Sequence, residues 1–394
     1  MRTLLVTGPG GSGRTTVAAA TALAAARAGH RTLVISADRA DTLGTALGTA
    51  PGAPATHPGL TTHRPDADAR FRDDLLALQE RAASALDLLG AERLDGEELT
   101  ALPGAEELAL LRALRDAARD DTYDTVVVDL PPTAKALATL ALPEQLRRYL
   151  RRLLPPERQA ARALRPVLGR LAGVPMPAAW LYEAAARRED DLAAVQRVIE
   201  APTTTVRLVA EPGPAGADAV RAAATGLALH GLRTDLLVAN RVLPDTSSDT
   251  WLAGVCAQQH KTLTEWESAY DHVGPVRRVP HLGRDPRGAD DLAALGLTAP
   301  APAGPEAAPW PVTDATADDG SRIYVWHIPL PGAARDELGL IRRGDEIVVT
   351  AGPFRRIVPL PSALRRCTVA GAGLHEGELR VRFAPDPDLW PSGR

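Results

Sequence analysis

The sequence predicts an α/β protein built on a doubly wound parallel sheet with a helical insertion, followed by a small all-β sandwich. Three observations predict this fold class. Short apolar segments alternate with helical stretches over residues 1–298. A glycine-rich stretch separates the first apolar segment from the first helical one. A stretch rich in proline and alanine, residues 299–321, precedes a region of short strands at close spacing.

The strand candidates of the first region are apolar on both faces, as buried parallel strands are. They are residues 3–7, 32–36, 125–129, 205–210 and 235–239. Helical stretches separate them, and this alternation predicts the doubly wound arrangement. Residues 143–200 interrupt it with a helical insertion. Four leucines of the insertion share one helix face: Leu146, Leu150, Leu153 and Leu154.

The region after residue 298 has a different character. The composition of residues 299–321 predicts a semi-rigid linker. Beyond it, glycines and prolines break residues 322–394 into short strands, which predicts an all-β sandwich. Its strand candidates are residues 322–328, 338–341, 345–350, 354–360 and 378–384.

Composition limits the classes of partner and compartment. The chain has 394 residues, room for two to three domains, and a net charge of −4, which argues against a nucleic-acid-binding face. Its only cysteines, Cys256 and Cys367, imply no disulfide framework. No signal peptide and no apolar run of ~20 residues is present, so we expect a cytoplasmic protein without a transmembrane segment.

The most informative motif reads GPGGSGRTT over residues 8–16, between the first strand and an alanine-rich helix. Glycines let the backbone approach a polyphosphate with its N–H groups pointing inward, and the helix start adds the positive end of its dipole. The P-loop pattern is G-x-x-x-x-G-K-[ST], and the chain departs from it only at the lysine, which is Arg14. We therefore predict a P-loop NTPase domain.

A dinucleotide-binding fingerprint is the rival interpretation of this loop. The pattern G-x-G-x-x-G is satisfied by Gly8, Gly10 and Gly13, and Asp38 ends the second strand as a ribose-binding acid would. Two features favour the P-loop. A cation and a hydroxyl directly follow the last glycine, and the third strand ends in Asp129, the position of a Walker B carboxylate.

Several motifs together resemble the arsenite-pump ATPases (ArsA) and the related ATPases that target tail-anchored membrane proteins. The matching segments are the glycine loop, Ser36-Ala37-Asp38 with Leu43, Gly104 with Glu106 and Glu107, Asp129-Leu-Pro-Pro-Thr133-Ala134-Lys135, and Asn240-Arg-Val-Leu-Pro244. The resemblance covers residues 1–298. It implies ATP as the ligand, Mg²⁺ as its metal and hydrolysis of ATP to ADP and phosphate as the activity.

The resemblance also implies a role for each matching residue. The phosphate-binding set would be Gly10, Gly11, Ser12, Gly13, Arg14, Thr15 and Thr16. Thr15 would place its hydroxyl on Mg²⁺, and Asp129 would hold the ion through water. Asp38 would position the attacking water, and Asn240 would hydrogen-bond the adenine edge. From the residues alone, Asp38 also fits a helix N-cap and Asn240 a turn.

Two departures from the family pattern bear on catalysis. The family's intradimer lysine is replaced by Pro9, and the loop lysine by Arg14, whose planar fork is bulkier than an ammonium. A transition-state cation can be worth 10³–10⁵ in rate, so we expect impaired hydrolysis. Lys135, one of only two lysines, lies in the loop after Asp129, and one hypothesis is that it replaces part of the missing charge. The alternative is an ordinary surface lysine on a loop.

Three hypotheses about function follow. The first is a nucleotide-dependent switch with weak or slow ATP hydrolysis. The second is a competent ATPase in which Arg14 and Lys135 suffice, with Asp38 as the third catalytic residue. The third is a non-catalytic scaffold that no longer binds nucleotide.

The resemblance extends to partners and to the C-terminal region. It implies a homodimer, but Pro9 removes the family's cross-subunit lysine and Cys256 alone cannot form the zinc clamp of the targeting ATPases, so the oligomeric state stays open. It also implies a protein client bound through the helical insertion, where Met176, Trp180 and Leu181 lie near the leucine stripe. The alternative is that this amphipathic stripe packs on its own domain. Residues 322–390 resemble the α-crystallin (small heat-shock protein) domain appended to some bacterial ArsA-like proteins. The matching run begins at Ile328-Pro-Leu-Pro-Gly332 and includes Asp345-Glu-Ile-Val-Val349. We see no catalytic constellation in this domain.

Overall fold

The computed structural model describes most of the chain and confirms the predicted fold class, an α/β domain followed by a β-sandwich. The described residues are 1–38, 40–50, 57–83, 86–87, 90, 92–153, 179–244, 248–269, 274–302, 310–317 and 320–389. Within these ranges, no helix combines the length and the apolar character that a bilayer span requires.

A seven-stranded parallel sheet forms the centre of the first domain, in the order β3-β2-β4-β1-β5-β6-β7. Its strands are β1 (Arg2–Thr7), β2 (Thr32–Ser36), β3 (Leu60–His63), β4 (Thr125–Asp129), β5 (Thr204–Ala210), β6 (Thr234–Val242) and β7 (Val276–Pro280). The five predicted strands are all present. β3 and β7 are additional; they lie at the two sheet edges, where polar residues replace the apolar pattern of the buried strands.

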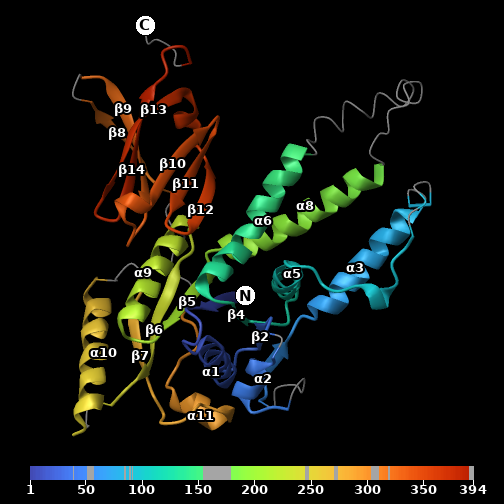
Figure 1. The fold of residues 1–394 in the computed structure, drawn as a ribbon, viewed down its shortest axis with the longest axis vertical. Helices are drawn as coiled ribbons and strands as arrows, with labels where there is room; N and C mark the ends of the chain where they lie inside the picture. Colours follow the sequence, from blue (N-terminus) through green and yellow to red (C-terminus); the bar gives the residue numbers. More distant parts are fainter. Residues whose placement is uncertain are drawn as a thin grey trace.

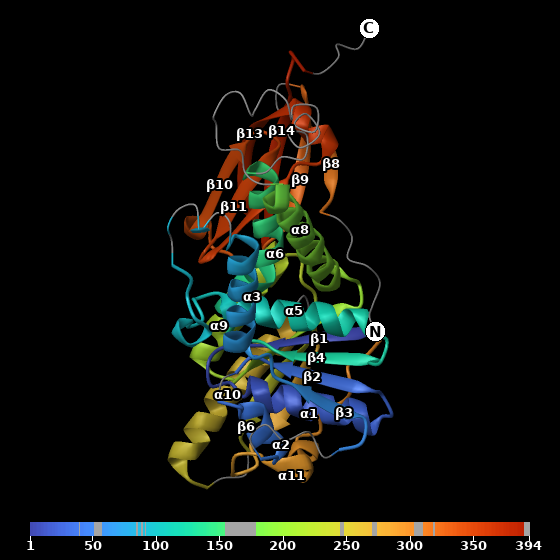
Figure 2. The ribbon, with the colours of Figure 1, turned by 90° about the vertical axis from the view of Figure 1, so that its right-hand side faces the viewer.

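Helices cover both faces of this sheet (Figure 2). One face packs against α1 (Arg14–Arg27), α2 (Thr42–Leu47) and α11 (Gly288–Ala294). The opposite face packs against α5 (Ala105–Arg119), α6 (Thr133–Leu153), α8 (Ala179–Glu200), α9 (Pro214–Leu229) and α10 (Thr250–Ala269). A further helix, α3 (Ala67–Arg81), lies against α5. Because α6 continues through Pro143, the predicted insertion shares its first helix with the segment that follows β4.

The C-terminal sandwich consists of two antiparallel sheets, β10-β11-β12 and β13-β14-β9-β8. Its strands are β8 (Val312–Thr316), β9 (Arg322–Pro329), β10 (Leu338–Arg343), β11 (Glu346–Ala351), β12 (Phe354–Pro359), β13 (Cys367–His375) and β14 (Glu378–Pro385). β8 lies inside the stretch expected to be linker. It pairs with β9, and the Trp310 ring just before it packs on Trp326 with ring centroids 5.8 Å apart. Part of the predicted linker therefore belongs to the sandwich.

One continuous hydrophobic core joins the two domains, because the sandwich rests on α6 and α9 (Figure 1). A close approach between them is at Gly226 in α9. A Cβ there would lie 2.5 Å from Leu137 Cδ1 and 2.8 Å from Phe354 Cζ, so only glycine fits without displacing its neighbours. This packing fixes the sandwich on α6 and α9, the helices that follow β4 and β5.

Ion pairs surround this domain contact. Glu346 at the start of β11 accepts hydrogen bonds from Arg148 at 2.9 and 2.6 Å, and a third from Arg152 at 2.9 Å. Arg356 on β12 pairs with Glu144 of α6 at 3.3 Å. Three charged residues of α6, Glu144, Arg148 and Arg152, thus form ion pairs with the sandwich.

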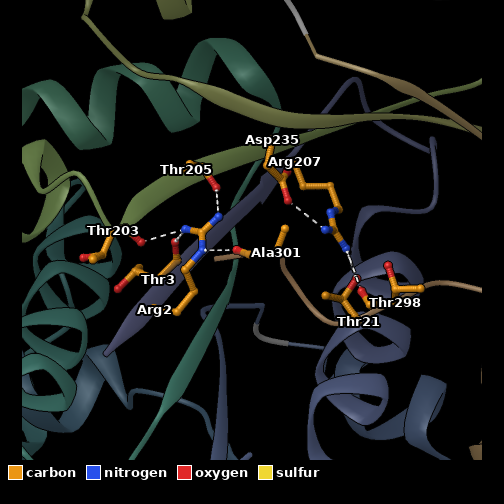
Figure 3. Close-up of polar contacts among 9 residues, drawn as sticks. All are labelled: Arg2, Thr3, Thr21, Thr203, Thr205, Arg207, Asp235, Thr298 and Ala301. Carbon is orange, nitrogen blue, oxygen red and sulfur yellow. Dashed lines mark hydrogen bonds and ion pairs between the residues drawn. The ribbon is translucent and has the colours of Figure 1, made fainter. Parts of the chain in front are cut away.

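A buried polar network closes the amino edge of the sheet, at the ends of the strands away from the glycine loop (Figure 3). Arg207 on β5 is 3% exposed and pairs with Asp235 at 2.7 Å, and it donates to the Thr21 hydroxyl at 2.9 Å. Arg2 donates to the carbonyl of Ala301 at 2.9 Å. The segment after α11 is thereby tied to the sheet.

Candidate functional site

The glycine loop joins β1 to α1 at the carboxyl edge of the sheet, where β1 lies between β4 and β5. Gly11 and Gly13 have φ values of 78° and 88°, in the left-handed region that glycine adopts without strain. Gly8 lies so close to β5 that a Cβ would be 1.9 Å from the carbonyl oxygen of Val209. These glycines are required by the path of the loop and by its contact with the next strand.

Asp129 ends β4 beside the loop and is only 6% exposed. Its Oδ2 accepts hydrogen bonds from the Thr15 hydroxyl at 2.8 Å and the Ser36 hydroxyl at 3.0 Å. Its Oδ1 is buried and has no hydrogen-bond partner within the described residues. Burial raises the pKa of Asp129, and the bonds from Thr15 and Ser36 and the charge of Arg14 oppose this rise. A buried carboxylate with one oxygen that has no partner among the described residues suits a hard cation.

Arg14 is the first residue of α1, and its guanidinium reaches across to the segment after β4. Nη1 donates to the carbonyl of Leu130 at 2.5 Å. Burial lowers the pKa of Arg14, whereas the nearby carboxylates of Asp129 and Asp38 raise it. The fork therefore lies close to both carboxylates and is engaged by a backbone carbonyl.

Asp38 follows β2 and is exposed, with both carboxylate oxygens engaged in the turn that leads to α2. Oδ1 accepts from the N–H of Ala40 at 3.0 Å, and Oδ2 accepts from the Thr42 hydroxyl at 2.6 Å. These contacts orient the carboxylate at the mouth of the site.

A cavity of 390 Å³ lies on the α5 side of the loop. It brings together five predicted site residues, which are Arg14, Thr15, Asp38, Asp129 and Lys135. Glu106 and Glu107 from the first turn of α5 line the same cavity. The predicted catalytic and metal-binding residues thus share one cavity.

The remaining predicted residues lie in the loop or on its other side. A second cavity, of 200 Å³, is lined by Gly13, Thr16 and Asn240 together with the segment after β7, residues 280–287. Asn240 is buried, and its Nδ2 donates to the carbonyl of Ser12 at 2.7 Å. Gly10 and Gly11 belong to the loop that separates the two cavities. The predicted set is therefore divided between two cavities that flank the loop.

Lys135 is the third residue of α6, and its ammonium is paired with α5. Nζ lies 3.2 Å from Glu107 Oε1 and 3.6 Å from Glu106 Oε2. The side chain is 50% exposed. In this arrangement the lysine lines the cavity but is held at its α5 wall.

Sequence reasoning missed some residues of the second cavity. Arg241 has a left-handed φ of 57°; its Nη1 donates to the carbonyl of Gly11 at 3.2 Å and lies 3.6 Å from a carboxylate oxygen of Glu211. Residue 280 ends an edge strand that the sequence pattern does not reveal, and residues 281–287 follow it. The sequence could have indicated these residues only through their place at the carboxyl end of a strand, because the carboxyl ends of parallel strands meet at one edge of the sheet.

A separate groove lies between α3, α5, α6 and α8. Its volume is 710 Å³, and most of its lining is apolar. Two residues of the predicted leucine stripe, Leu146 and Leu150, line it, whereas Leu153 is 77% exposed. Leu154 and Met176 lie outside the described residues, as do the side chains of Trp180 and Leu181.

Comparison with known proteins agrees with this architecture. A family model described as anion-transporting ATPase matches residues 1–298. A second model, described as the HSP20-like domain found in ArsA, matches residues 321–383. Both predicted resemblances are confirmed by these matches.

Three relatives illustrate the range of similarity. The chain is 69% identical to Uncharacterized protein SCO2128 of Streptomyces coelicolor, with 100% of both chains covered. It is 35% identical to Protein Rv2184c of Mycobacterium tuberculosis, over 99% of this chain and 98% of that one. It is 26% identical to Putative arsenical pump-driving ATPase 1 of Aquifex aeolicus, over 97% of this chain and 99% of that one.

The matches and the site geometry lead to the same conclusion. A glycine loop between β1 and α1, flanked by the Asp129 carboxylate, stands where the family match places its ATPase domain. The chain belongs to the anion-transporting ATPase (ArsA) family and carries that family's HSP20-like domain at residues 321–383.

Proposed function

We propose that this protein binds ATP with Mg²⁺ at the glycine loop and acts as a nucleotide-dependent switch that hydrolyses ATP slowly. The observation that carries the proposal is the buried Oδ1 of Asp129, which has no partner within the described residues, in a carboxylate whose Oδ2 accepts from the Thr15 hydroxyl. Such an oxygen is costly to bury unless a ligand satisfies it.

The two cavities support one direction for the nucleotide. Asn240 and residues 280–287 surround the cavity that would take adenine. Residues 10–16 would hold the phosphates through backbone N–H groups and the Arg14 cation. The γ-phosphate would then enter the cavity that Asp38, Asp129 and Arg14 line.

Mg²⁺ fits the donors present at this point. Thr15 would offer its hydroxyl, and Asp129 would hold the ion's water shell, because Mg²⁺ prefers oxygen ligands and keeps several waters. When bound, the ion would neutralise charge on the phosphates. Asp38 would orient the attacking water through its exposed carboxylate.

Slow hydrolysis follows from the cations available. Arg14 is engaged by the Leu130 carbonyl, and Pro9 supplies no side-chain cation at the position of the family's intradimer lysine. A competent ATPase would need Arg14 and Lys135 to supply the missing charge between them. A scaffold without nucleotide binding is the third hypothesis.

Phosphate release from MgATP tests the proposal, using the full chain and its Asp38→Asn variant. We expect turnover below about 1 s⁻¹, lower by at least tenfold in the variant because a water-positioning carboxylate is lost. Faster turnover would favour the competent ATPase. Phosphate release at the same background rate from both proteins would contradict hydrolysis. If a separate titration then showed that MgATP still binds, the protein would be a nucleotide-dependent switch without hydrolysis.

The apolar groove favours a second role, binding an apolar helix of a client protein. Its open, leucine-lined wall between α3, α5, α6 and α8 supports this proposal. We expect a fluorescent apolar helical peptide to bind the full chain and to bind Leu150→Asp at least tenfold more weakly. Equal affinities would overturn the idea. We also propose that the protein is a homodimer and lies in the cytoplasm. Light scattering would measure the mass of the particle in solution.

A further inference from the structure

Lys135 forms a bridge between the two helices that wall the first cavity. It lies in the first turn of α6, and both of its partners lie in the first turn of α5. Its ammonium is 3.2 Å from Glu107 Oε1 and 3.6 Å from Glu106 Oε2. All three side chains line the cavity proposed for the γ-phosphate.

The charges around this cavity oppose an entering phosphate. Four carboxylates line it, from Asp38, Glu106, Glu107 and Asp129. The cations that line it are Arg14 and Lys135, and Arg14 already donates to the Leu130 carbonyl. A γ-phosphate would therefore compete with the glutamates for the ammonium of Lys135.

The bridge is built so that it can open. Lys135 is 50% exposed and carries its charge on a flexible four-carbon stem, and exposed ion pairs of this kind hold weakly. A terminal phosphate carries more charge than one carboxylate and offers several acceptor oxygens. The lysine can exchange one set of acceptors for the other without a change in the core.

We propose that Lys135 with Glu106 and Glu107 forms a γ-phosphate-sensitive latch between α5 and α6. ATP draws the ammonium from the glutamates and releases the first turn of α6 from α5, whereas ADP, which lacks the γ-phosphate, leaves the latch closed. This inference rests on the proposed function and deepens it, since it names the residues that distinguish the triphosphate from the diphosphate.

Calorimetric titration of the full chain with Mg²⁺ and either a slowly hydrolysed ATP analogue or ADP tests the latch. The variants are Lys135→Ala, the double variant Glu106→Gln with Glu107→Gln, and the triple combination. We expect the triphosphate-to-diphosphate affinity ratio to fall at least fivefold in Lys135→Ala and to rise in the double variant. The triple variant should match Lys135→Ala, because in a latch the glutamates change the affinity ratio only through their contact with the lysine.

Two results separate this latch from simpler explanations. If the triple variant shows the same rise in the triphosphate-to-diphosphate affinity ratio as the double variant, the glutamates act by repulsion of the phosphate alone and the latch is overturned. An unchanged ratio in Lys135→Ala also overturns it, while binding of the triphosphate by the wild type still upholds the proposed function. Absence of any binding overturns both. Lys261→Ala serves as the matched control, because this lysine is 80% exposed on α10 and pairs only at 4.0 Å with Glu265; its ratio should equal that of the wild type.

Discussion

The Thr15 hydroxyl donates a hydrogen bond of 2.8 Å to Oδ2 of Asp129, joining the first turn of α1 to the end of β4. The Ser36 hydroxyl of β2 donates to the same oxygen at 3.0 Å. Oδ1 of Asp129 is buried and has no partner among the described residues. Three elements, α1, β2 and β4, therefore meet at one buried carboxylate.

Replacing Asp129 by Asn should stabilise the protein while weakening its dependence on magnesium. Burial raises the pKa of Asp129, so the folded state disfavours its charge at neutral pH, and an amide of the same shape still accepts from Thr15. We expect a higher thermal midpoint and a loss of at least about tenfold in Mg²⁺-stimulated ATP binding. Ser36→Ala is the control, since it retains the Asp129 carboxylate. If Mg²⁺ stimulated ATP binding equally in Asp129→Asn and the wild type, Asp129 would not be the residue that holds the ion.

Removing one partner of the buried Arg207–Asp235 pair should destabilise the α/β domain strongly. Arg207 is 3% exposed and Asp235 12% exposed, so Asp235→Ala leaves an uncompensated buried guanidinium (Figure 3). Breaking such a pair costs about 3–5 kcal/mol. Urea unfolding of the two proteins measures this loss.

The exposed pair between Arg278 and Glu267 gives the comparison. Its side chains are 44% and 42% exposed, and Glu267→Ala should change the unfolding free energy by less than about 1 kcal/mol. Similar losses in Asp235→Ala and Glu267→Ala would show that burial does not govern the strength of these pairs.

Mild acid should destabilise the protein through His230, which follows α9 and lies near Arg356 of the sandwich. Burial, and then the charge of Arg356, lowers the pKa of His230 to about 4 from its ordinary 6.5. The unfolded chain therefore takes up a proton as pH falls below 6.5, before the folded protein does. The contribution of neutral His230 to the free energy of unfolding is complete above about pH 6.5, and about 2 kcal/mol of it is lost between pH 7 and pH 5.

Urea unfolding of the wild type and His230→Gln at these two pH values checks the effect. The variant should lose about 2 kcal/mol less than the wild type on going to pH 5. Parallel losses in the two proteins would show that His230 is not the titrating group.

A larger residue at Gly226 should weaken the contact between the domains. The Cβ of Gly226→Val would lie 2.5 Å from Leu137 Cδ1 and 2.8 Å from Phe354 Cζ, so the side chains of Leu137 and Phe354 have to shift. Overpacking of this kind costs about 1–3 kcal/mol. We expect a lower thermal midpoint in Gly226→Val and a small change in Gly254→Val, where a Cβ meets open space. Equal midpoints for Gly226→Val and the wild type would refute this contact.

The sequence predicts the buried strands and the loop well because their chemistry is local. β2 and β4 have the predicted bounds, since each is a run of apolar residues between polar ends. The edge strands β3 and β7 escape prediction because their sequences, LTTH and VRRVP, lack continuous apolar character. β8 escapes because only its pairing with β9 distinguishes it from linker.

The site shows the same division. The positions of Gly13, Thr15 and Asp129 can be predicted from the sequence, since Gly13 and Thr15 belong to one local motif and Asp129 ends an apolar strand that pairs with β1. The partners of Lys135 cannot, because Glu106 and Glu107 reach it only through the packing of α5 beside α6. Asn240, the residue predicted to contact adenine, lines the second cavity. Residues 280–287 line the same cavity only because β7 pairs with β6, and the sequence alone does not reveal this pairing.

Equilibrium titration of the full chain with MgATP decides whether residues 8–16 bind a triphosphate. We expect saturable binding of one nucleotide per chain, weakened when Mg²⁺ is removed and when Thr15 is replaced by Ala. A folded protein that binds no MgATP at millimolar concentration would contradict the assignment of residues 8–16 as a triphosphate-binding loop.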